Sequence, residues 1–115
     1  MNPRQIEHTA RKKLEEMLGV QLPKRELVVG YDSKTFPKIH EFDLVSDDKR
    51  IIGEITSTKK AFDVAFKNCI FLSKVEAWKR MLVLTDKKFC QSFKSKYEGI
   101  LPSSVEVLFL NLNEI

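Results

Sequence analysis

The sequence predicts an α/β fold in which a mixed β-sheet is flanked by helices, in the order α-β-β-β-α-β-α-β. An amphipathic pattern opens the chain, two β-rich segments joined by a polar turn follow, and helical and strand-like segments then alternate. A hairpin followed by such alternation is typical of a mixed sheet with helices packed on its faces. The 115 residues are expected to form one domain, residues 1–115.

The first helix is expected over residues 3–18. Asn2 can cap its first turn and Gly19 follows its last, positions that these residue types favour at helix ends. Its apolar side chains recur at the spacing of one helix face, at Ile6, Ala10 and Leu14.

Strands are expected where β-branched and apolar residues cluster between turn-favouring residues, at residues 26–31, 39–46, 50–56, 80–85 and 105–112. The segment SDDK separates the second strand from the third and suits a short antiparallel hairpin. A long helix over residues 60–79 and a shorter one over 87–97, capped by Asp86, complete the order. Trp78 and the eight phenylalanines are expected in the core, because most of them lie on these apolar patterns.

Two acidic residues, Asp43 and Glu54, interrupt the apolar strands on either side of the SDDK turn. If these strands pair around the turn, the two carboxylates lie nearly opposite one another and point into one recess. Such a pair repels unless a cation or a proton lies between its members. Mg²⁺ fits this arrangement because it prefers oxygen ligands. Alternatively, both carboxylates are half-exposed strand residues paired with lysines.

The segments EFDLV (residues 41–45) and GEIT (residues 53–56) follow a helix and a strand and precede another helix. This order resembles the core of the PD-(D/E)XK nuclease superfamily, which has the restriction-endonuclease-like fold. There, an aspartate on the second core strand and an acidic residue on the third hold the metal, and a lysine follows two positions later. The resemblance implies that Asp43 and Glu54 bind Mg²⁺ or Mn²⁺, whereas Thr56 stands in the place of the lysine.

EFDLV is most similar to the GEIDLV-type motif of small archaeal junction-resolvase-like nucleases, in which the first helix also contributes an acidic residue. Glu7 occupies the matching place on the first helix. Its alternative role is that of a solvent-facing helix residue. His40 is expected to pack in the core or face solvent, since strand alternation points it away from Asp43.

Thr56 cannot supply the positive charge that the superfamily lysine provides. Lys59 and Lys60 follow directly and Lys67 lies in the next helix, so the long stem of any of them could bring an ammonium group to the recess. The alternative is that Lys59 and Lys60 are a solvated pair and that catalysis is lost.

The resemblance implies a metal-dependent nuclease that cleaves nucleic acid, with DNA as the first expectation. The net charge of +4 and pI near 9.1 mildly favour a polyanionic partner. A homodimer would suit duplex or junction substrates, since two cuts need two sites. Two alternatives stay open: an inactive domain of this fold that binds nucleic acid or assembles with proteins, and a ligand- or partner-binding domain in which the acidic pair is structural.

The cellular setting is expected to be cytoplasmic. Cys69 and Cys90 match no metal-ligand spacing and are expected to be reduced thiols. The N-terminal segment is charged and lacks the apolar core of a signal peptide, and no apolar run is long enough to span a bilayer.

Overall fold

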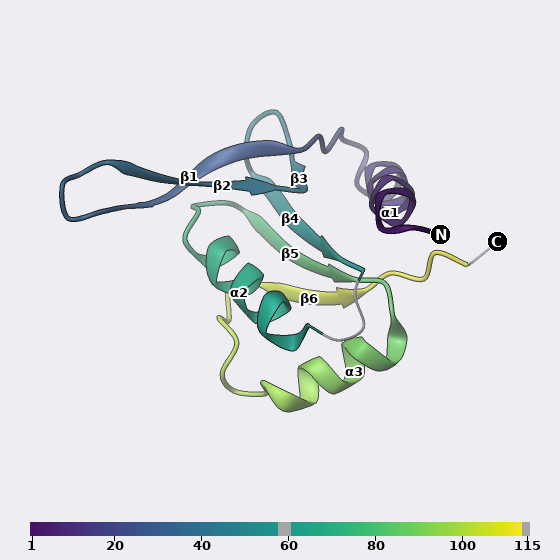
Figure 1. The fold of residues 1–115 in the computed structure, drawn as a ribbon. Coiled ribbons are helices and arrows are strands. Elements are labelled where there is room, and N and C mark those ends of the chain that lie inside the picture. Colours follow the sequence, from purple (N-terminus) through teal and green to yellow (C-terminus); the bar gives the residue numbers. More distant parts are fainter. Residues whose placement is uncertain (58–60, 114–115) are drawn as a thin grey trace.

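The computed structural model describes residues 1–57 and 61–113, which form an α/β protein (Figure 1). Its elements follow one another as α1 (Pro3–Leu18), β1 (Arg25–Tyr31), β2 (Pro37–Phe42), β3 (Leu44–Val45), β4 (Ile51–Thr56), α2 (Phe62–Ser73), β5 (Lys79–Leu84), α3 (Lys87–Lys96) and β6 (Glu106–Phe109). The α/β class and the mixed character of the main sheet are confirmed.

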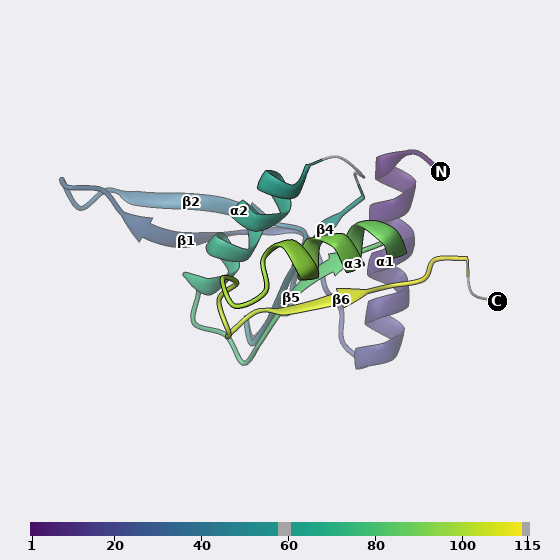
Figure 2. The same ribbon diagram turned by 90° about the horizontal axis from the view of Figure 1, so that it is seen from below.

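The strands form two sheets instead of the single sheet expected. The main sheet has the order β3-β4-β5-β6, with β3 antiparallel to β4 and the other neighbours parallel. β1 and β2 form a separate antiparallel ribbon that projects from the body (Figures 1 and 2). The expected strand over residues 39–46 is divided at Asp43, because a bend there sends β2 to pair with β1 and leaves β3 with β4.

The helices cover both faces of the main sheet (Figure 1). On one face, side chains of β4 and β5 pack against α2 and α3, and this cluster includes Ile52, Leu82, Leu84, Ala65, Cys69, Phe89 and Phe93. On the other face, α1 packs against the sheet through a second cluster that includes Ala10, Leu14, Leu44, Ile51, Met81 and Val83. Alternation along the strands therefore buries both faces of the sheet.

Both ends of α1 and the start of α3 lie where the capping residues predicted them. Asn2 Oδ1 accepts the backbone N–H of Gln5, while the Asn2 N–H donates to Gln5 Oε1, both at 2.9 Å. Gly19 ends α1 with a left-handed φ of 70°. Asp86 caps α3 by accepting the Phe89 N–H at 2.9 Å.

The second helix is shorter than expected. It ends at Ser73, and the next residues cross to β5, where the N–H groups of Trp78 and Lys79 both donate to the Arg50 carbonyl. In the sequence, apolar residues keep a helical spacing past Ser73 as far as Trp78, so the spacing does not reveal where the helix ends. Trp78 is 81% exposed, and Phe36 and Phe109 are also exposed, so the prediction that these three residues lie in the core was wrong.

Both cysteines are buried and free, and burial raises the pKa of the Cys69 thiol to about 12. Among the residues that the structure describes, no helix has the length and apolar character needed to cross a membrane.

Gly53 in β4 permits close packing at the centre of the sheet. A Cβ at this position would lie 2.9 Å from Leu44 Cδ1 and 3.1 Å from the Met81 carbonyl oxygen. We expect Gly53→Ala to lower the free energy of unfolding by about 1–3 kcal/mol, because the neighbouring strands would have to separate. Urea denaturation measures this change. Gly30→Ala is the control, since nothing lies within 4 Å of a Cβ there; an equal loss in both variants would contradict the packing argument.

Candidate functional site

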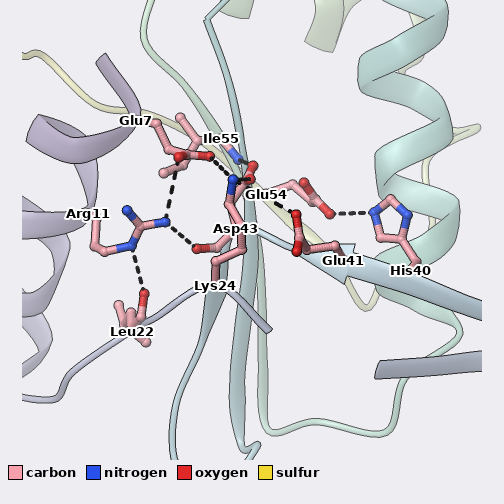
Figure 3. Close-up of polar contacts among 9 residues, drawn as sticks. All are labelled: Glu7, Arg11, Leu22, Lys24, His40, Glu41, Asp43, Glu54 and Ile55. Carbon is pink, nitrogen blue, oxygen red and sulfur yellow. Dashed lines mark hydrogen bonds and ion pairs between the residues drawn. The ribbon is translucent and has the colours of Figure 1, made fainter. Parts of the chain in front are cut away.

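Three acidic residues from separate elements gather at the edge of the main sheet. Glu7 comes from α1, Asp43 from the bend between β2 and β3, and Glu54 from β4 (Figure 3). The hairpin register explains the meeting of the last two: Leu44 pairs with Gly53, so the next step along both strands places Asp43 opposite Glu54. The proximity inferred from the SDDK turn is thus present in the structure, and α1 adds Glu7.

Asp43 completes the edge of β4. The partner strand β3 begins only at Leu44, so it offers no main-chain carbonyl to the N–H of Ile55. Asp43 Oδ2 accepts this N–H instead, at 2.9 Å. Arg11 of α1 holds the Asp43 main chain through a 2.7 Å hydrogen bond from Nη2 to the carbonyl oxygen. Arg11 Nε also donates to the Leu22 carbonyl at 3.0 Å. The bend is therefore fixed from both sides.

Glu54 is the most deeply buried of the three carboxylates, with a side-chain exposure of 6%. Burial, followed by the nearby charge of Asp43, raises its pKa to about 10. Glu54 Oε1 lies 2.6 Å from Nε2 of His40. Burial lowers the pKa of His40, so at neutral pH we interpret the contact as a hydrogen bond from a protonated Glu54 to a neutral imidazole.

His40 belongs to this site, although strand alternation placed it on the face away from Asp43. That argument assumed one continuous strand. The bend at Asp43 interrupts the strand, so side chains before and after it no longer alternate regularly between the two faces. The imidazole stacks on Phe71 of α2 with ring centroids 4.2 Å apart and meets the edge of Phe42. The expected packing role is present, and the Glu54 contact is additional.

Lys24, just before β1, is a cation that lies among the carboxylates, and Nη2 of Arg11 lies 3.9 Å from Glu7 Oε2. Lys24 Nζ lies 3.2 Å from Glu7 Oε1 and 4.0 Å from both Asp43 Oδ1 and Glu41 Oε1 (Figure 3). Burial and the neighbouring Asp43 raise the pKa of Glu7, and Lys24 opposes this shift. Sequence reasoning missed Lys24 because no motif marks it and only the tertiary fold brings it to Asp43.

The other lysines considered from the sequence are placed differently. Lys59 and Lys60 lie outside the described residues. Lys67 lies on α2 with its Nζ 5.7 Å from the centre of the Phe71 ring. Thr56, at the expected lysine position, is buried, and its hydroxyl has no hydrogen-bond partner among the residues that the structure describes.

The donor chemistry of this cluster suits a hard divalent cation, since carboxylate oxygens are the ligands that Mg²⁺ prefers. However, within residues 1–57 and 61–113 no three His, Cys, Asp or Glu side chains are arranged as a ready metal site. The reason is visible in their partners: Asp43 accepts from Ile55, Glu54 contacts His40, and Glu7 pairs with Lys24. Metal binding would require Lys24 to withdraw and Glu54 to lose its proton.

The chain matches no protein-family model, no curated protein and no solved structure. The fold and the cluster of Glu7, Asp43 and Glu54 are therefore the features of this chain that bear on its function.

Proposed function

We propose that the protein is a metal-dependent nuclease of the restriction-endonuclease-like fold that hydrolyses phosphodiester bonds in DNA. The observation that carries this proposal is the convergence of Glu7, Asp43 and Glu54, from three elements, at one edge of the main sheet. Burying several carboxylates together costs free energy unless cations or protons compensate them. A divalent cation would supply that compensation.

The arrangement of elements supports the proposed fold. EFDLV ends in the short strand β3, GEIT lies on the antiparallel neighbour β4, and α2 then leads to the parallel strand β5. Both acidic positions of the resemblance therefore lie on adjacent chain segments and at the same level of the sheet. The first helix packs beside them and directs Glu7 to the same edge.

In the proposed site, Asp43 and Glu54 would hold Mg²⁺ or Mn²⁺, with Glu7 beside them. When bound, the metal would lower the pKa of a water molecule and polarise the phosphate. Asp43 keeps its main chain fixed through Arg11, which orients the carboxylate. His40 can receive the proton that Glu54 must release, because its Nε2 is 2.6 Å away.

Lys24 is the residue that we propose in place of the missing motif lysine. Its ammonium already lies within 4.0 Å of Glu7, Glu41 and Asp43, and its side chain is 41% exposed. A long flexible stem allows it to leave the carboxylates and stabilise negative charge that grows on a phosphate. Lys59 and Lys60 remain proposals for the same task. The basic net charge would support backbone binding that weakens as salt rises.

The test combines metal binding and cleavage by the native chain. We expect calorimetry to detect Mg²⁺ and Mn²⁺ binding, and we expect nicking of plasmid or branched DNA that a chelator abolishes. Lys24→Met should slow cleavage on the order of 10²-fold, as removal of one charge-stabilising donor does elsewhere, while metal binding is retained or tightened. Lys12→Met, an exposed lysine of α1, is the control.

Thr56 favours a second candidate, an inactive domain of the same fold that binds nucleic acid, because it cannot supply positive charge. DNA binding by the native chain without metal-dependent cleavage would support that candidate and contradict the enzyme. If the chain binds neither metal nor DNA, both proposals fail and the acidic cluster is structural.

A further inference from the structure

The ribbon of β1 and β2 projects from the body as an arm, defined here as residues 25–42 (Figures 1 and 2). The body-facing side of the arm is anchored at its base, where Leu27 and Phe42 are buried and His40 stacks on Phe71 of α2. Val29 also packs against this core, and the rest of the ribbon projects away from the body (Figure 1). A two-stranded hairpin alone is marginally stable in water.

The opposite side of the arm and its tip carry exposed apolar side chains. Val28 pairs with Ile39 across the ribbon, and Tyr31 pairs with Pro37 nearer the tip. Their exposures are high for large apolar residues: 43% for Val28, 58% for Ile39, 69% for Tyr31 and 64% for Phe36. Several exposed apolar side chains that neighbour one another in this way form an apolar strip, which is typical of an interaction surface.

Charge is unevenly distributed along the same arm. At the base, Glu26 and Glu41 are direct cross-strand partners, an arrangement in which like charges repel. At the tip, Lys34 and Lys38 are exposed. Glu41 Oε1 also lies 4.0 Å from Nζ of Lys24, the residue just before the arm. The other charged groups of the arm have local partners as well. Arg25 bonds to Asp47 at 3.3 Å, and the Asp32 carboxylate accepts the N–H groups of Lys34 and Phe36.

We propose that the arms of two copies of this chain pack antiparallel about a two-fold axis. The apolar strips would then face each other, and the basic tip of each arm would lie over the acidic base of its partner. This is a self-complementary surface, as an isologous dimer requires. A nucleic acid is a poorer occupant, because the basic and acidic residues of the arm cancel: Arg25, Lys34 and Lys38 against Glu26, Asp32 and Glu41.

Substitutions that place like charges opposite each other across the proposed interface test this proposal. Sedimentation velocity over a wide concentration range is expected to show dimers of the native chain. Glu26→Lys makes both ends of the arm basic and Lys34→Glu makes the tip more acidic, so each variant should weaken its own dimer about tenfold or more. An equimolar mixture of the two variants should associate more tightly than either alone, because each basic end then meets an acidic one.

Glu16→Lys, an exposed change on α1, should leave the native association unchanged, and circular dichroism checks that each variant is folded. A native chain that stays monomeric at every concentration, as expected for an arm that binds a different protein, overturns the proposal. So does a mixture no more dimeric than its components. Either result leaves the nuclease proposal intact, because the arm argument does not use the carboxylate site.

Discussion

Asp43→Asn is expected to abolish detectable Mg²⁺ binding and to slow metal-dependent cleavage on the order of 10²-fold or more. The asparagine removes the negative charge but keeps an oxygen that can accept the Ile55 N–H, which Asp43 Oδ2 now accepts at 2.9 Å. The Arg11 bond to the main-chain carbonyl of residue 43 is also unaffected by this substitution. The loss should therefore come from the charge and leave the fold in place.

The matched control for this variant is Asp47→Asn in the neighbouring turn. Asp47 has a side-chain exposure of 99% and pairs only loosely with Arg25, at 3.3 Å. Calorimetry and initial nicking rates should not distinguish this control from the native chain, and thermal unfolding verifies that both variants fold. Native metal affinity in Asp43→Asn would place any metal away from this cluster.

In the absence of metal, Glu54 is expected to make the native protein less stable as pH rises above 4.5, and Glu54→Gln should remove this contribution. The pKa of Glu54 is about 10 in the folded protein, against 4.5 as its ordinary value. Between these values the folded state holds a proton that the unfolded chain lacks. The contribution of Glu54 to stability is therefore largest below pH 4.5 and declines toward pH 10, by at most about 1.4 kcal/mol per pH unit.

Glutamine imitates the protonated acid, since its amide can donate to the His40 Nε2 that Glu54 now contacts. We expect Glu54→Gln to match the native chain near pH 5 and to exceed it at pH 8 by on the order of 2 kcal/mol or more. Urea denaturation in the presence of a chelator measures both profiles.

Glu16→Gln on the exposed side of α1 serves as the control and should follow the native profile. Adding Mg²⁺ should stabilise the native chain and leave Glu54→Gln unaffected, because binding to the folded state alone raises stability. Parallel pH profiles for the native chain and Glu54→Gln would show that the folded state does not hold this proton.

Local signals predicted the regular elements well. Asn2, Gly19 and Asp86 each cap a helix through contacts within a few residues, so the ends of α1 and the start of α3 could be read from sequence. The meeting of Asp43 and Glu54 was likewise predictable, since the SDDK turn sets the register of the strands around it.

Features that depend on tertiary structure could not be predicted in the same way. The bend at Asp43 involves one residue and hardly changes the alternation of apolar residues in the sequence. The sequence therefore predicted neither the second sheet nor the contact between His40 and Glu54. Lys24 lies far from Glu54 in sequence and carries no motif. Likewise, Trp78 fits the helical spacing of the apolar residues before it in the sequence, but in the structure its N–H donates to the Arg50 carbonyl and lies outside any helix.

The absence of a loop between β2 and β3 makes Asp43 a mechanical link. Phe42 is the last residue of the arm ribbon and Leu44 the first of the main sheet, so a single residue joins the two sheets. Arg11 clamps the carbonyl of this residue and Ile55 its carboxylate. A load on the arm, such as a partner that tilts it, would be transmitted as torsion at Asp43. Movement of the arm would therefore change the backbone conformation at Asp43, the residue proposed to bind the metal.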